Sequence, residues 1–167
     1  TVIGVLELLG PDVLNKIFTE CQFKESPEVR YDQEIEKGSR RRLDAIVEDS
    51  NQVLAIESKL GATYNQSQLE DEFQDLTEYT EKPHHLYLIT GHTATPAGLT
   101  SLNIPEDKLS WTGWEKIAEL LTEFGEAEIT STQNAVKEFA INKLHSEGFK
   151  PFDGFQAVLN KENTLTQ

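Results

Sequence analysis

Two short stretches decide the fold, RRRLDAIVE at residues 40–48 and VLAIESK at residues 53–59. They are separated by DSNQ at residues 49–52, a cluster of residue types that favour turns. Both stretches are rich in residues that favour strands. The pattern therefore predicts a tight β-hairpin with strands at 41–48 and 53–58.

The register of this hairpin follows from the position of the turn. A turn centred between Ser50 and Asn51 places Glu48 opposite Val53, Ile46 opposite Ala55 and Asp44 opposite Glu57. Alternation puts Asp44, Ile46 and Glu48 on one face of the strand, with Leu43, Ala45 and Val47 on the other. Facing side chains have Cβ atoms about 5 Å apart, and two carboxylates at that separation repel unless a proton or a cation lies between them.

A divalent cation is the natural occupant of such a pair. Mg²⁺ is usually held by one or two carboxylates together with water and phosphate oxygens. Lys59 points to the same face as Glu57, so it could orient or deprotonate a water or neutralise charge on a phosphorane-like transition state. The alternative is a pair of exposed acids with Lys59 as a simple salt-bridge partner. We favour the cation site, because a solvated sheet face does not normally place like charges opposite each other.

Hydrophobic periodicity extends the interpretation along the chain. An amphipathic helix is expected over 2–18, interrupted at Gly10 and restarted by Pro11. Strands are also expected at 29–36, 86–90 and 109–111, and helices at 66–80, 114–124 and 132–145, the helix at 66–80 with its acids on the polar face. Because strands and helices do not alternate strictly, we expect an α/β fold with a mixed sheet flanked by helices. One domain should span 1–159, followed by a polar C-terminal tail at 160–167.

The composition is strongly acidic. Among 167 residues there are 15 Lys and Arg against 29 Asp and Glu, a formal net charge of −14. This argues against a general binder of nucleic acid or anionic membranes. The basic cluster at 40–42 lies beside Asp44, however, so a phosphodiester substrate is still possible if it binds a small cationic strip or if a partner helps to hold it.

The single cysteine, Cys21, excludes an internal disulfide and favours a reducing compartment. No partner signature surrounds it, so we expect it to be packed rather than nucleophilic. No apolar run approaches the roughly 20 residues of a membrane span. We therefore expect a cytoplasmic protein. Trp111 and Trp114 are most simply core residues, and the alternative is that an exposed tryptophan stacks on a base.

Asp44, then Glu57-x-Lys59 at the end of an apolar strand, then a glutamine that opens the next helix (Gln66 or Gln68) resemble the PD-(D/E)XK nuclease superfamily. The expected order of helix, three strands, helix and strand over residues 1–90 is similar to the core of that family. The resemblance implies a restriction-endonuclease-like core with additional C-terminal helices. It also implies hydrolysis of a phosphodiester with Mg²⁺ or Mn²⁺. We therefore expect an endo- or exonuclease, and we favour DNA over RNA as its substrate.

The resemblance also implies roles for individual residues. Asp44 and Glu57 would be metal ligands, Lys59 the catalytic lysine and Gln68 an auxiliary polar contact. Leu43 stands where the family's name has a proline. Many members place a further glutamate on the first helix, for which Glu7, Glu20 or a residue before Thr1 are the candidates.

The basic cluster and the possibility of an inactive protein give two further predictions. Arg41 and Arg42 are candidates for phosphate contacts, since an arginine can bind phosphate in a bidentate manner. The alternative function is a catalytically inactive member of the family that serves as a binding or protein-interaction module. Under either function, a homodimer or a protein partner would supply further contacts to DNA.

Overall fold

The computed structural model describes residues 4, 8, 10–34, 42–60, 63–124 and 130–149. The helices are α2 (Pro11–Ile17), α3 (Gln66–Tyr79), α4 (Trp114–Glu123) and α5 (Ser131–Ser146), with two short 3₁₀ helices, η1 (Leu99–Ser101) and η2 (Glu106–Lys108). The strands are β1 (Glu28–Glu34), β2 (Arg42–Glu48), β3 (Val53–Ser58), β4 (His84–Thr90) and β5 (Leu109–Gly113). The expected order of helix, three strands, helix and strand is confirmed from α2 to β4.

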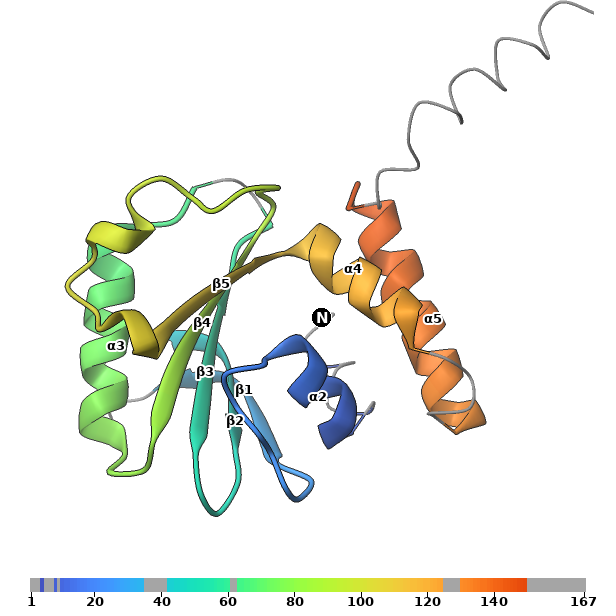
Figure 1. Cartoon of the computed structure of the whole chain (residues 1–167), viewed down its shortest axis with the longest axis horizontal. Coiled ribbons are helices and arrows are strands. Elements are labelled where there is room, and N and C mark those ends of the chain that lie inside the picture. The colour runs from blue at the N-terminus through green and yellow to red at the C-terminus, as the bar shows by residue number, and fades with distance from the viewer. Residues whose placement is uncertain are drawn as a thin grey trace, which may run out of the picture.

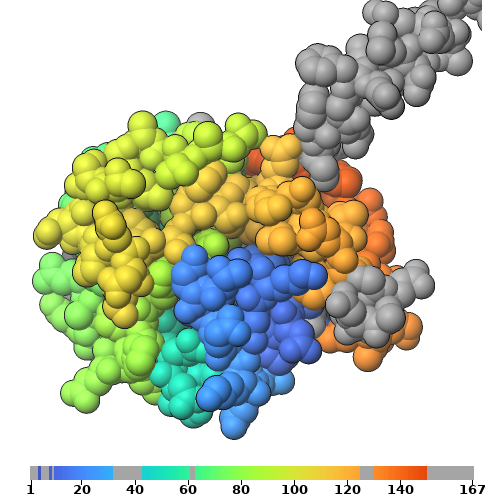
Figure 2. Space-filling view, viewed as in Figure 1, coloured from blue at the N-terminus to red at the C-terminus, as the bar shows by residue number. Residues whose placement is uncertain are grey.

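The five strands form one mixed sheet in the order β1-β2-β3-β4-β5. Strands β1, β2 and β3 are antiparallel neighbours, whereas β3, β4 and β5 run parallel. Helix α3 covers one face of the sheet, and α2 and α4 cover the other, with α5 packed outside α4 (Figure 1). In Figure 2, α2 (blue) and α4 (orange) lie side by side. The predicted fold class, an α/β protein with a mixed sheet flanked by helices and additional C-terminal helices, is confirmed.

The turn at 49–52 sets the predicted hairpin register. The Asp49 side chain accepts hydrogen bonds from the backbone N–H groups of Asn51 and Gln52, at 2.8 and 2.9 Å. The expected pairs Glu48–Val53 and Ile46–Ala55 are both present. Among the described strand residues, however, the ladder between β2 and β3 ends at Ala45–Ile56. The expected pairing of Asp44 with Glu57 is therefore wrong in detail.

Strand β3 lies at the centre of the sheet and is buried on both faces. Leu54 and Ile56 pack into the cluster beneath α2 and α4, whereas Val53 and Ala55 pack into the cluster beneath α3. Leu43 belongs to the cluster beneath α3, although strict alternation predicts that it shares a face with Ala45 and Val47. This departure occurs where β2 leaves its ladder with β3.

Several sequence-based interpretations concern residues outside the described ranges. These are Glu7, Arg41 and the C-terminal tail at 160–167. Among the helices that the structure describes, none has the length and apolar character needed to cross a membrane.

The central position of β3 yields a stability test. Replacing Leu54 with Ala should lower the free energy of unfolding by about 3 kcal/mol, because it leaves a cavity in a fully buried site. Urea unfolding measures this change, and the dependence on urea concentration should stay the same. Leu60→Ala is the matched control, since Leu60 is 61% exposed just after the same strand. Equal losses in the two variants would contradict the described burial of β3.

Candidate active site

Glu57 brings a carboxylate into the interior at the end of β3. Its position in the strand directs it to the face covered by α3, and it is only 2% exposed. Oε1 forms an ion pair with the Lys59 ammonium and accepts a hydrogen bond from Gln68 Nε2 at 3.2 Å. Oε2 is buried without a hydrogen-bond partner. Burial raises the pKa of Glu57 above its ordinary value, and the Lys59 ammonium offsets only part of this effect.

Lys59 is held firmly by its backbone. Its N–H donates to the carbonyl of Ile89 in β4 at 2.8 Å, and its carbonyl accepts from the indole N–H of Trp114 at 3.2 Å. Burial alone would lower the pKa of Lys59, but the contact with Glu57 outweighs it and the pKa is raised. The side chain is therefore an ammonium at neutral pH.

Gln68 links Glu57 to a second buried acid. Asn65 caps the start of α3 by accepting from the Gln68 backbone N–H, so Gln68 lies in the first turn of the helix. Its side-chain amide donates both to Glu57 and to Glu72 Oε1, the latter at 2.6 Å. Gln66, the other glutamine considered from the sequence, instead has its side chain close to Gly98.

Glu72 corrects the expectation that the acids of this helix lie on its polar face. It is 1% exposed, and Asp75 on the same helix is also buried. Burial raises the pKa of Glu72 to about 8, and the charge of Glu57 adds to the shift. Glu72 Oε2, like Glu57 Oε2, is buried without a hydrogen-bond partner.

Asp44 lies beside Glu57 in an arrangement that strand alternation alone does not predict. The N–H groups of Val53, in β3, and of Lys59, directly after it, point toward β4, so the N–H of Ser58 points toward β2. There the Asp44 carboxylate, rather than a backbone carbonyl, accepts from the N–H of Ser58 at 2.8 Å and from its hydroxyl at 2.5 Å. The Asp44 charge contributes to the raised pKa of Glu57 and of Glu72, so the three acids form one electrostatic group.

The remaining candidates lie elsewhere. Arg42 starts β2 opposite Glu34 of β1. Glu20 follows α2, and its charge raises the pKa values of Cys21 and Tyr87, which pack in the cluster on the other face of the sheet from α3. Cys21 is buried, and burial raises its thiol pKa to about 12, so the prediction of a packed cysteine agrees with the structure.

Glu72 and the contact that Trp114 makes with Lys59 were not predicted from the sequence. A signal for Glu72 is present in the sequence, because it lies three residues after Leu69 and four before Leu76, on the apolar stripe of α3. It also lies four residues after Gln68, the spacing at which helical side chains meet. Trp114 carries no such signal, since its contact with Lys59 joins segments far apart in the sequence.

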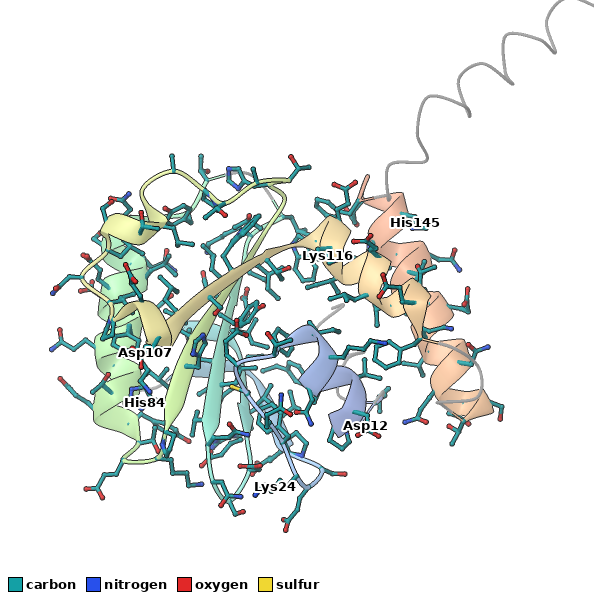
Figure 3. The ribbon with its side chains drawn as sticks, in the orientation of Figure 1. Asp12, Lys24, His84, Asp107, Lys116 and His145 are labelled. Atoms are coloured by element: carbon teal, nitrogen blue, oxygen red, sulfur yellow. The ribbon has the colours of Figure 1, made fainter. Side chains whose placement is uncertain are left out.

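A groove of about 590 Å³ adjoins the ends of β4 and β5. Its walls include Trp111 and Lys116, the latter labelled in Figure 3 at the start of α4. Glu57, Leu88 and Trp111 are register neighbours across β3, β4 and β5, so Trp111 lies about 10 Å from Glu57 on the same face.

The donor set fits a divalent cation that prefers oxygen. Carboxylates are the ligands that Mg²⁺ and Mn²⁺ favour, and Glu57 and Glu72 each have one buried oxygen without a partner. Within the described ranges, no three His, Cys, Asp or Glu side chains are already grouped in a geometry that could hold a metal ion. Binding would therefore use two carboxylates with water and substrate oxygens, or require a side chain to rotate.

No protein-family model matches the chain, and no curated protein matches it either. Among solved structures, the chain is similar to the small subunit of the heterodimeric restriction endonuclease R.BspD6I, with 16% identity and a TM-score of 0.40 over 85% of this chain and 80% of that chain. At this TM-score the likeness supports no conclusion about the site or its activity.

The buried acid Glu72 should make stability depend on pH. With divalent cations chelated, the folded state keeps a proton on Glu72 up to a pH of about 8, whereas the unfolded chain loses it near the ordinary value of 4.5. The folded state then binds more protons, so the free energy of unfolding should fall by a few kcal/mol as pH rises from 5 to 8. Glu72→Gln should remove most of this fall.

Urea unfolding at several pH values measures the effect. Some pH dependence should persist in Glu72→Gln, because the pKa of Glu57 is also raised. Glu78→Gln, an exposed substitution on the same helix, should leave the profile unchanged. Parallel profiles for the parent and Glu72→Gln would contradict the buried, protonated state of Glu72.

Proposed function

We propose that the chain is a metal-dependent phosphodiester hydrolase, a nuclease of the PD-(D/E)XK type that acts on DNA rather than RNA. One observation carries the proposal: the Lys59 ammonium is paired with the buried carboxylate of Glu57, and Asp44 and Gln68 border the same group. These are the residues for which the family resemblance implies a catalytic site.

Asp44 and Glu57 would hold Mg²⁺ or Mn²⁺. Bound there, the cation would supply positive charge to the scissile phosphate and make a water molecule more acidic. Lys59 would hold its ammonium beside the phosphate and stabilise the charge that develops on it. Gln68 would keep the Glu57 carboxylate in position through its hydrogen bond.

The backbone of Lys59 supports this role. Hydrogen bonds to Ile89 and from Trp114 fix the main chain on both sides of the residue. An ammonium on a fixed backbone needs little reorganisation when charge develops on a substrate, which is the main requirement of electrostatic catalysis.

The acidic composition limits how nucleic acid would bind. The groove beside Trp111 is the candidate path for the substrate strand, since an indole offers a face on which a base can stack. Glu115, Lys116 and Glu119 also line this groove, and their net negative charge disfavours phosphates there. The basic residues 40–42, and a protein partner or second copy of the chain, would supply the phosphate contacts.

A catalytically inactive binding or protein-interaction module is the second candidate. It is favoured by the hydrogen bonds that the Asp44 carboxylate accepts from Ser58 and by the neutralising pair of Glu57 and Lys59. Both acids that would hold the cation thus already have partners within the chain.

A cleavage assay tests the proposed activity. With Mg²⁺ or Mn²⁺, the chain should cleave DNA, and Lys59→Ala and Asp44→Ala should each lower the rate by at least about 100-fold, because each removes a group that stabilises the transition state. Single-stranded DNA, double-stranded DNA and RNA are compared as substrates. Lys143→Ala, which breaks an exposed ion pair on α5, is the control and should keep the parent rate. Equal rates in the parent and in both site variants would exclude the proposed mechanism.

Calorimetric titration with Mn²⁺ separates the two candidates. An active site should bind Mn²⁺ in the parent and lose this binding in Glu57→Gln, because a buried ligand charge is removed. Glu138→Gln, an exposed acid on α5, should bind as the parent does. A catalytically inactive binding module should show no heat of Mn²⁺ binding that disappears in Glu57→Gln.

A further inference from the structure

Helix α3 contributes an acid that neither the hairpin nor the family resemblance provides. Glu72 lies on the apolar stripe of α3 and is 1% exposed. Acids are almost never buried to this extent unless they are paired or bind a metal. No basic side chain forms an ion pair with it among the described residues, and its one hydrogen bond comes from the neutral amide of Gln68.

The same amide joins Glu72 to the proposed site. Gln68 Nε2 donates to Glu72 Oε1 at 2.6 Å and to Glu57 Oε1 at 3.2 Å. Two oxygens that share one donor at these distances lie within about 6 Å of each other, the range of direct interaction between charged groups. The second oxygen of each acid is buried and unpartnered.

Glu20, the other described acid considered for the site, acts on a different part of the molecule. The resemblance implies a further glutamate on the first helix, and Glu20 is the candidate within the described residues. Its charge acts on Cys21 and Tyr87, which pack on the face of the sheet opposite Glu57. The charge of Glu20 thus acts on the face of the sheet that α2 and α4 cover, whereas Glu57 and Glu72 lie on the face that α3 covers.

We propose that Glu72 is the third carboxylate of the cation site, binding the metal together with Asp44 and Glu57. This inference rests on the proposed function. With all three acids ionised and Lys59 charged, the group carries three negative charges and one positive charge. A single divalent cation balances the remaining two. The Gln68 amide, which now links Glu57 and Glu72, would turn aside so that the two inward oxygens face the cation.

Glu72→Gln tests the assignment by Mn²⁺ titration of the full chain. The substitution keeps the size of the side chain and an oxygen that can accept from Gln68, but it removes the carboxylate. A ligand role predicts that Mn²⁺ affinity falls at least about tenfold. If Glu72 serves only as the hydrogen-bond acceptor of Gln68, the affinity should not change.

The same helix offers a matched control. Gln74 donates to Glu78 at 3.1 Å, which is the same pair at the same spacing as Gln68 and Glu72, but on the exposed side. Glu78→Gln should bind Mn²⁺ as the parent does. Thermal unfolding with and without Mn²⁺ provides a second readout: the cation should raise the melting temperature of the parent and of Glu78→Gln, and raise that of Glu72→Gln much less.

The outcomes separate this inference from the proposed function. Parent-like Mn²⁺ affinity in Glu72→Gln, with binding lost in Glu57→Gln, would overturn the role of Glu72 and leave the proposed cation site standing. Absence of Mn²⁺ binding in the parent would overturn both. Weak binding in Glu72→Gln and in Glu57→Gln, with parent-like binding in Glu78→Gln, supports the three-carboxylate site.

Discussion

The group of side chains at the end of β3 depends most on how the buried carboxylate of Glu57 is paired. An ionised carboxyl in a protein interior costs several kcal/mol unless a counter-charge and hydrogen bonds compensate it. Lys59 supplies the charge and Gln68 the hydrogen bond, yet one oxygen of Glu57 stays without a partner. Strand β3, loop 59–60 and helix α3 all converge on this group. A buried acid that is only partly paired costs stability, which is the pattern expected of the proposed functional site.

The fold was predictable from the hairpin outward. The turn residues at 49–52 set the register, so the pairs Ile46–Ala55 and Glu48–Val53 followed from the spacing alone. Helix α3 followed from hydrophobic periodicity. These features depend on local turn chemistry and on repeats of two or 3.6 residues, both of which are visible in one sequence.

The details of the site were less predictable, because they depend on how the elements meet. Alternation places Asp44 opposite Glu57, but the Asp44 carboxylate instead continues the ladder by accepting from the N–H of Ser58. That substitution of a side chain for a backbone acceptor arises only where β2 leaves β3. Glu72 was not predicted for another reason, because acids on an amphipathic helix are normally assigned to its solvent-exposed face. Only its position between Leu69 and Leu76 on the apolar stripe indicates that Glu72 is buried.

The C-terminal elements contact the main chain of the candidate site rather than being an addition to a complete core. Trp114 opens α4, is 3% exposed, and packs in the same cluster as residues of α2 and α5. Its indole N–H also binds the carbonyl of Lys59. Packing that fixes Trp114 therefore also fixes the main chain of Lys59, and through the ion pair it fixes the Glu57 carboxylate. A chain ending after β4 would keep Asp44, Glu57, Lys59 and Gln68 in sequence but lose the contact that holds the lysine in place.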